Sequence, residues 1–346
     1  MSQPPPNRAD PGPPAGAAWF ELAEPAPGPW ARRAWPWAFG VLALLALILV
    51  VLHLGTIADF AALARSARPA WFLLACAAQA GTYVSAALVW RQVLRRAGHP
   101  RPLRALVPLG IAKLFTDQVV PSGGVSGAVL VARGLVRRRV PADVAMAALL
   151  VGLVSYFAAY LVCVLASVAI LSAHGRASAP LFGVVALFVA VVVMIPSGVL
   201  WARRWGHLLP PRVVGSLPGA SLLLKAIADA PTGLLRDPAL LAQTVCLETA
   251  VFVLDALTLW LAACALGATP APWIAFVGFM MASMAATLGP IPLGLGTFEA
   301  ACVATLGLLG MAIETALAAT LLLRGLTFWL PMIPGLWLAR REMATG

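Results

Sequence analysis

The chain has 346 residues, of which 61% are hydrophobic and only 11% are charged, and its mean hydropathy is +0.91. Soluble domains carry about a quarter charged residues, so this composition excludes an ordinary soluble protein. The net charge of +11 would suit a nucleic-acid partner, but the arginines cluster beside hydrophobic runs and no basic soluble module accompanies them.

The first segment, residues 1–34, contains nine prolines and few large aliphatic side chains. This composition is typical of a disordered tail. Arg32 and Arg33 precede the first hydrophobic run, and no small-residue cleavage site follows it. We therefore expect an uncleaved membrane anchor and a membrane domain that occupies residues 35–341.

Six hydrophobic runs are long enough to cross a bilayer as helices, which takes about 20 residues each. Arginine clusters flank these runs, and the positive-inside rule places such clusters in the cytoplasm. The expected product is a multi-pass protein of the inner or plasma membrane with both termini in the cytoplasm. The six runs are 36–54, 70–90, 144–171, 180–201, 239–266 and 313–338.

Two further apolar regions, 105–132 and 273–310, are too short for two full spans each. With the arginine clusters in the cytoplasm, the first region begins and ends inside the cell and the second begins and ends outside. The sequence therefore predicts two re-entrant helical hairpins of opposite orientation. The expected fold is an all-α polytopic membrane protein with six full transmembrane helices and these two hairpins.

An internal repeat is expected from the same order of elements. A shift of 171 residues places Pro121 on Pro292 and Gly123 on Gly294. The two units begin on opposite sides of the membrane, which is the inverted-topology repeat of many secondary transporters. The predicted organisation is repeat one at 36–171, repeat two at 180–338, and a cytoplasmic linker at 203–238 with an interfacial helix at 216–230.

A glycine- and proline-rich stretch marks the tip of each predicted hairpin. A chain that reverses inside the membrane leaves backbone amides unpaired. A helix that begins there presents its N-terminus to a phosphate or carboxylate, and nearby hydroxyls add donors. The alternative is a pair of ordinary helix breaks with close glycine packing. The tip residues expected to bind substrate are Pro121, Ser122, Gly123, Gly124 and Ser126 in the first hairpin, and Gly294, Gly296 and Thr297 in the second.

Several ionisable side chains fall inside the apolar segments, where a charge costs roughly 2.5–3.5 kcal/mol and usually faces a cavity or a partner. In the functional interpretation, Arg133 and Arg324 bind an anionic headgroup, and Glu299 couples protons or contacts a cationic group. In the structural interpretation these charges form internal pairs, such as Glu299 with Arg324. The remaining residues expected to couple protons or to pair are Lys113 and Asp117, four apart on one helix, and Glu248 and Asp255.

The region around Val119–Val136, with its Pro-Ser-Gly-Gly turn and Arg133, resembles the first signature of the lysylphosphatidylglycerol synthase transmembrane-region family, also called flippase-like domain proteins. The region Leu288–Gly335, with Glu299 and Arg324, resembles its second signature. The resemblance implies a membrane domain of the kind that, in bifunctional synthase/flippases, moves aminoacylated phosphatidylglycerol between leaflets.

Two departures from the family pattern affect the expected substrate. Ala128 stands where many members carry an acidic residue, and residues 148–157 lack the Glu-Arg and Asp pattern that often follows. The substrate of the best-known members is therefore not implied for this chain. The sequence also contains no soluble aminoacyl-transferase domain, so we expect no synthase activity.

Catalytic motifs are not found in the sequence. The four histidines lack an acid at the His-x4-Asp spacing, there is no Gly-x-Ser-x-Gly or Walker motif, and the five cysteines lack metal-ligand spacing. We expect no enzyme activity, no cofactor and no metal. The first hypothesis is a lipid translocator that moves an anionic or aminoacylated lipid by alternating access. The alternative is a noncatalytic subunit that partners a lipid- or envelope-modifying enzyme, and a homo-oligomer is compatible with both.

Overall fold

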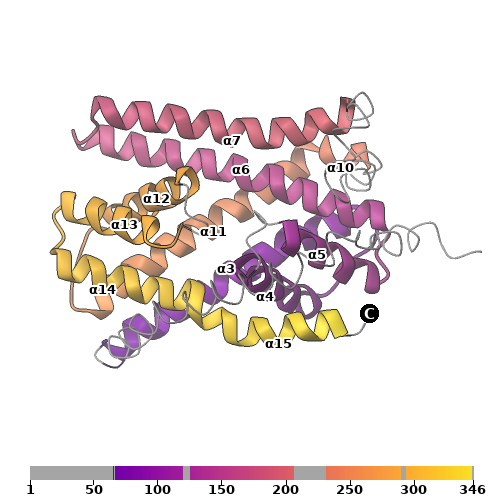
Figure 1. The fold of residues 1–346 in the computed structure, drawn as a ribbon, viewed down its shortest axis with the longest axis horizontal. Helices are drawn as coiled ribbons and strands as arrows, with labels where there is room; N and C mark the ends of the chain where they lie inside the picture. The colour runs from indigo at the N-terminus through magenta and orange to yellow at the C-terminus, as the bar shows by residue number, and fades with distance from the viewer. Residues whose placement is uncertain (1–64, 66, 120–124, 206–230, 290–293, 345–346) are drawn as a thin grey trace, which may run out of the picture.

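The computed structural model describes residues 65, 67–119, 125–205, 231–289 and 294–344, which contain helices and no strand. Five helices are long and apolar enough to cross a membrane. They match five of the six predicted runs, and the sixth run, 36–54, lies outside the described residues, as does the predicted interfacial helix. The five are α3 (Pro69–Arg96), α6 (Ala142–Ala173), α7 (Ala179–Trp205), α11 (Pro238–Ala265) and the continuous stretch Ile313–Arg340 (Figure 1).

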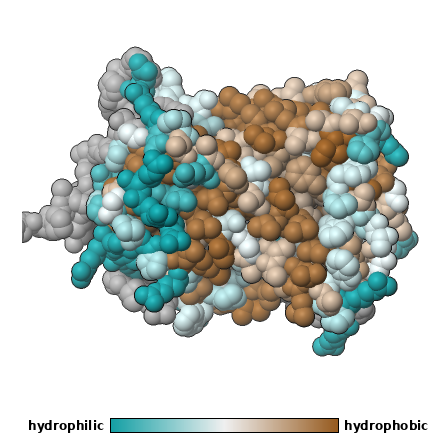
Figure 2. Space-filling view, turned by 180° about the vertical axis from the view of Figure 1, so that it is seen from behind, coloured by the Kyte–Doolittle hydropathy of each residue, from teal (hydrophilic) through white to brown (hydrophobic). Residues whose placement is uncertain are grey.

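A broad band of hydrophobic side chains separates two polar ends of the molecule (Figure 2). One end, called the arginine-rich end below, carries Arg95 and Arg96 at the end of α3, Arg137 at the end of α5, and Arg138 and Arg139 directly after it. The opposite end carries His174 and Arg176, which follow α6. An apolar belt between polar ends is the surface of a bundle that crosses a bilayer.

The first predicted hairpin is a pair of packed helices, α4 (Leu103–Val119) and α5 (Val125–Arg137). Its open end lies at the arginine-rich end, because Arg101 donates from Nε to the Arg138 carbonyl at 2.8 Å and from Nη2 to the Arg139 carbonyl at 3.0 Å. A glycine permits the close approach of the two helices, since a Cβ at Gly134 would lie 2.5 Å from Leu109 Cδ1.

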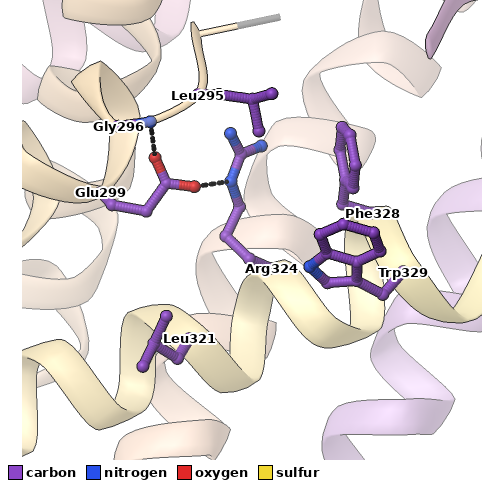
Figure 3. A pocket seen from close by; sticks show the side chains of 7 residues that line it. All are labelled: Leu295, Gly296, Glu299, Leu321, Arg324, Phe328 and Trp329. Carbon is purple, nitrogen blue, oxygen red and sulfur yellow. Dashed lines mark hydrogen bonds and ion pairs between the residues drawn. The ribbon is translucent and has the colours of Figure 1, made fainter. Parts of the chain in front are cut away.

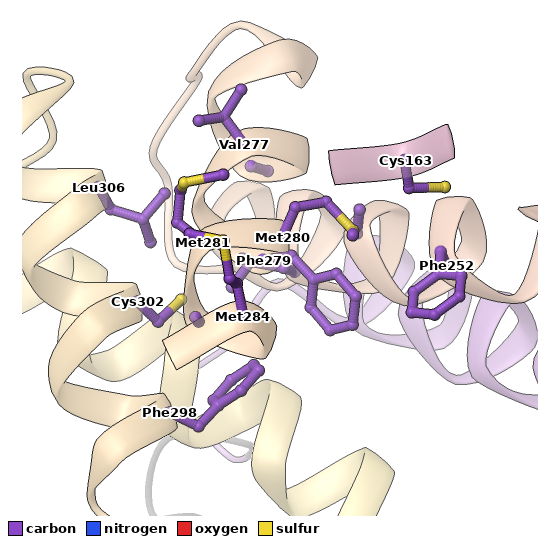
Figure 4. Close-up of a cluster of buried hydrophobic side chains, with 14 of the residues drawn as sticks. Cys163, Phe252, Val277, Phe279, Met280, Met281, Met284, Phe298, Cys302 and Leu306 are labelled. Carbon is purple, nitrogen blue, oxygen red and sulfur yellow. The ribbon is translucent and has the colours of Figure 1, made fainter. Parts of the chain in front are cut away.

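The second predicted hairpin is α12 (Pro272–Leu288) with α13 (Thr297–Leu308). Its open end lies opposite the arginine-rich end. There His174 stacks on Trp273 with ring centroids 4.1 Å apart, and Arg176 donates to the Leu308 carbonyl at 3.1 Å. The hairpin contributes sulfur-containing side chains to the core, and the flexible methionines among them can fill irregular gaps (Figure 4). These sulfur-containing side chains include Met280, Met281, Met284 and Cys302.

The two 28-residue helices α3 and α11 form the most extensive helix–helix contact in the described part of the chain. Arg96 pairs with Asp237 at 2.5 Å at one end, and the Arg68 amide donates to the Ala265 carbonyl at 2.9 Å at the other. The helices are therefore antiparallel. Each half continues with a 17-residue helix and then a shorter one, of 13 residues in α5 and 12 in α13.

The last membrane helix contains a wide turn. It runs as α14 (Ile313–Arg324), the π-helical turn η3 (Gly325–Trp329) and α15 (Leu330–Ala344). Within the turn the Leu330 amide donates to the Gly325 carbonyl, five residues back. Pro331 has no N–H to continue either an α or a π pattern, so the helix adjusts ahead of it.

Two contacts fix this last helix against the first half of the chain. The Tyr83 hydroxyl on α3 donates to the Leu326 carbonyl of η3 at 3.3 Å. Beyond the turn, α15 packs along α4 at Gly335, where a Cβ would lie 2.6 Å from Phe115 Cβ. The helix that carries Arg324 is therefore in contact with both α3 and the first hairpin.

Candidate functional site

The first hairpin holds an ion pair next to its tip. Lys113 Nζ lies 2.6 Å from Asp117 Oδ2, so the predicted i,i+4 pair is confirmed. The other carboxylate oxygen, Asp117 Oδ1, accepts the Gly127 amide of α5 at 2.9 Å. A Cβ at Gly127 would overlap this carboxylate, so glycine is required there. One carboxylate therefore joins α4, the lysine and the first turn of α5.

The second hairpin has an ion pair at its tip as well. Gly296, with φ of +80°, precedes α13, and its amide donates to Glu299 Oε2 at 2.7 Å. Glu299 Oε1 accepts from Arg324 Nε on α14 at 2.5 Å. This pair was expected under the structural interpretation and is confirmed. It connects the tip of one hairpin to the last membrane helix.

The Arg324 side chain is only 14% exposed and lies against two aromatic rings. Its Cζ is 4.7 Å from the Phe298 ring centroid and 5.4 Å from that of Phe328, both within cation–π range. The guanidinium faces a pocket of about 190 Å³ between the tip and the π-helical turn (Figure 3). The pocket is lined by Leu295, Gly296, Glu299, Leu321, Arg324, Phe328 and Trp329.

Other predicted tip residues contribute in different ways. Gly294 has φ of +63° and fits tightly on α12, since a Cβ there would lie 2.5 Å from Ala286 Cβ. The Thr297 hydroxyl is buried and has no hydrogen-bond partner among the described residues. The Ser126 hydroxyl lies 3.5 Å from the Thr116 carbonyl oxygen. Pro121, Ser122, Gly123 and Gly124 lie outside the described residues.

The structure does not bring Arg133 into either ion pair. It lies exposed on α5 and forms no hydrogen bond or ion pair with any residue that the structure describes. The sequence predicts that Arg133 and Arg324 bind the same headgroup, but the structure does not place Arg133 in the ion pair that holds Arg324.

The two acids of α11 lie along one side of the helix, near the first hairpin and α3. Lys113 is close enough to Glu248 to interact with it electrostatically. Asp255 has Gln79 of α3 as a neighbour, and its Oδ1 atom is buried without a hydrogen-bond partner in the described part of the chain. The sequence reasoning overlooked Gln79, although a glutamine inside an apolar run is itself a signal.

The sequence predicts backbone amides at the hairpin tips that are available to bind an anion, but two of the described ones already have hydrogen-bond acceptors. Gly127 and Gly296 both donate to carboxylates of the chain itself, so an incoming anion has to compete with Asp117 or Glu299. Within the described ranges, no group of three or more histidine, cysteine or acidic side chains is placed to hold a metal ion. The chemistry that this arrangement offers is the exchange of one oxyanion for another on a cation.

The comparisons with known proteins agree with this membrane architecture. The family model for the lysylphosphatidylglycerol synthase TM region matches residues 37–335, and no soluble synthase domain is indicated. No protein of curated function matches the sequence significantly. Since the family model spans most of the chain, including both hairpins and the Glu299–Arg324 pair, the chain belongs to the lysylphosphatidylglycerol synthase transmembrane-region family.

Proposed function

We propose that this chain translocates a lipid with an anionic headgroup, a phospholipid or an aminoacylated lipid, between the leaflets of a membrane. The observation that carries the proposal is the pair of hairpin tips, each of which holds a carboxylate, a cation and a helix-starting amide. Broken helices that meet within the bundle are typical of secondary transporters, whose substrate sites lie at the breaks. We assign the chain no catalytic step.

The proposal treats the two halves as inverted repeats with re-entrant hairpins. It is supported by the antiparallel α3 and α11, by hairpins that open at opposite ends, and by matching helix lengths. Helix α6 begins at Ala142 and α14 at Ile313, the same shift of 171 residues that aligns the tip prolines. Rocking one half against the other would then open the tips alternately to each side.

The positive-inside rule orients the proposed transporter. Arginines concentrate at the end where α4 and α5 open, so we place this end in the cytoplasm of an inner or plasma membrane. The α12–α13 hairpin then opens on the outer side. In this orientation the Arg324 pocket belongs to the hairpin that faces outward, and the Lys113–Asp117 pair belongs to the one that faces inward.

Arg324 is the proposed headgroup contact. A guanidinium recognises a phosphate in the same way as a carboxylate, by charge-assisted hydrogen bonds, so a lipid phosphate can replace Glu299. The pocket of about 190 Å³ is smaller than ordinary ligand pockets of about 300–1,000 Å³. It therefore suits one polar group of a lipid whose acyl chains stay in the bilayer.

The test is dithionite quenching of fluorescent phosphatidylglycerol in liposomes that hold the purified protein. Wild type is expected to expose the protected inner-leaflet fraction, and Arg324→Ala is expected to abolish this exposure. The matched control is Arg340→Ala, an exposed arginine on the same continuous helix, which should behave like wild type. Arg324→Lys keeps a cation beside Glu299 and tests whether translocation needs the paired N–H donors of the guanidinium.

Two results would count against the proposal. If Arg324→Ala translocates as fast as wild type, the headgroup site lies elsewhere. If wild type matches empty liposomes for both an anionic and a zwitterionic lipid, translocation of these lipids is excluded. The noncatalytic-subunit alternative is then tested by a pull-down that looks for a lipid- or envelope-modifying enzyme.

A further inference from the structure

The interface between α3 and α11 buries polar side chains within the apolar belt. Gln79 is only 5% exposed and Thr82 only 3%. The Thr82 hydroxyl donates its one hydrogen to the Gln79 carbonyl at 2.7 Å, so it can only accept from the Gln79 amide nitrogen, 3.0 Å away. This fixes the orientation of the Gln79 side-chain amide, with its nitrogen toward Thr82.

The fixed orientation leaves two buried acceptors without a donor. Gln79 Oε1 and Asp255 Oδ1 have no hydrogen-bond partner among the residues that the structure describes, and the two side chains are neighbours. Unpaired buried acceptors are costly, and an unpaired carboxylate is the costliest. A single proton on Asp255 removes the charge and converts one acceptor into a donor for the other.

Asp255 forms no ion pair with any residue that the structure describes. Helix α11 packs against α3, α6, α12 and α14, and α12 carries no ionisable side chain. On α14 the one cation, Arg324, is paired with Glu299. The ionisable groups on these elements are Cys76, Tyr83, Arg91, Arg95 and Arg96 on α3, Asp143, Tyr156, Tyr160 and Cys163 on α6, Cys246, Glu248 and Cys264 on α11, and Glu314 and Arg324 on α14.

A second contact connects this cluster to the pocket. Tyr83 lies one turn after Gln79 on α3, and its hydroxyl donates to the Leu326 carbonyl. Leu326 belongs to the π-helical turn, two residues after Arg324. In the π pattern its carbonyl would bond the amide of residue 331, but that residue is Pro331 and has no N–H. Tyr83 therefore supplies a donor that the helix lacks.

We propose that Asp255 is a proton-binding site, in which the protonated carboxyl donates to Gln79 Oε1, and that proton occupancy is transmitted through Tyr83 to the π-helical turn beside Arg324. The role of this relay rests on the proposed lipid translocation, whereas proton binding itself does not. A proton fits better than a metal ion, since no group of three or more histidine, cysteine or acidic side chains among the described residues is placed to hold a metal. The proton comes from water and is returned to water, so no other reactant is needed.

The first measurement is infrared spectroscopy of the full chain in liposomes, which detects the C=O stretch of protonated carboxyl groups as pH is raised. Asp255→Asn is expected to lose one protonated-carboxyl band that wild type and Glu248→Gln both retain. Identical bands in wild type and Asp255→Asn would overturn the proton site. This readout does not depend on any lipid movement.

The second measurement is lipid translocation as a function of pH with the same fluorescent phosphatidylglycerol. Wild type is expected to change its rate by up to about tenfold per pH unit, the limit for one titrating group. Tyr83→Phe is expected to keep the carboxyl band and lose this dependence, and Glu314→Gln to keep both. A wild-type translocation rate that does not change with pH would overturn the relay. If neither wild type nor any variant translocates the lipid, the proposed function is overturned, and the infrared result alone decides whether Asp255 binds a proton.

Discussion

The two hairpin tips use the same three groups in different arrangements. In the first, carboxylate and cation lie on one helix, Lys113 and Asp117 on α4, and the amide comes from α5. In the second, carboxylate and amide belong to the start of α13, and the cation, Arg324, comes from α14, 25 residues along the chain. The ion pair and the amide hydrogen bond of the first tip lie within its own hairpin, whereas the ion pair of the second joins the hairpin to a neighbouring helix.

This difference separates local from long-range roles. Breaking the first ion pair changes one hairpin, because both charges stay on α4. Breaking the second removes the ion pair between α13 and α14, although Arg324 still lies against the Phe298 ring of α13. Opening the second tip would therefore change the contacts of another membrane helix. The ion pair of the first tip can be removed by substitutions on α4 alone.

The largest expected effect comes from Glu299→Ala. It removes the acceptor for the Gly296 amide and the carboxylate of the Glu299–Arg324 ion pair, and breaking a buried pair costs up to about 3–5 kcal/mol. Glu299→Gln keeps an oxygen for the amide and should cost less. The measurement is the free energy of unfolding in detergent micelles, and equal losses for the two variants would show that the amide bond adds nothing.

Next in size is Gly127→Ala. The new methyl group would occupy the position of the Asp117 carboxylate, and overpacking of this kind costs about 1–3 kcal/mol. The control is Gly110→Ala in the same hairpin, where the nearest atom to a Cβ, on Trp90, is 3.7 Å away. That variant should gain up to about 1 kcal/mol from helix propensity. If both variants lose stability, the cause is the added methyl group in the hairpin helices in general and not the overlap with Asp117 at the tip.

Replacing Asp117 is expected to have an effect of comparable size that reports on one hydrogen bond. Asp117→Ala leaves the Gly127 amide without its acceptor, at a cost of roughly 1–3 kcal/mol in unfolding free energy. Asp117→Asn retains an oxygen that can accept from the amide, so most of the stability should return. If asparagine is as damaging as alanine, the charge next to Lys113 matters more than the bond to α5.

The smallest effect is expected for Lys113→Ala. The lysine side chain is 31% exposed and its partner is on the same helix, where i,i+4 pairs contribute about 0.2–0.5 kcal/mol. A double-mutant cycle measures this coupling directly against that of Glu299 with Arg324. Coupling energies of equal size in the two cycles would contradict the distinction between an ion pair within one helix and an ion pair that joins two helices.

Much of the fold could be predicted from the sequence, because the bilayer fixes the length of a spanning helix. The runs 144–171 and 239–266 became α6 and α11 with small shifts at their ends. The same argument predicts re-entrant hairpins, since 105–132 is too short for two spans; the structure shows a packed pair of helices there, and re-entry into the membrane stays a prediction. The Lys113–Asp117 pair followed from helix geometry alone.

The rest depends on packing that spacing does not encode. Glu299 and Arg324 were grouped by their burial in apolar sequence, but the bond between them requires the actual approach of α13 and α14. Arg133 was grouped with them because it follows a tip, yet its place on α5 leaves it exposed. Gln79 is recognisable in the sequence as a polar residue in an apolar run, but its neighbour Asp255 follows only from the packing of α3 on α11.

The π-helical turn Gly325–Trp329 accommodates one extra residue in the last membrane helix. An α-helix advances about 100° per residue, so a residue added or deleted in a regular α-helical stretch rotates everything beyond it by that angle. A π turn widens locally and takes up the extra residue, so the helix on either side keeps its phase. Deleting one residue from this turn would therefore narrow the helix beside Arg324 and leave Gly335 packed against Phe115, whereas the same deletion in α14 would turn Gly335 away from Phe115.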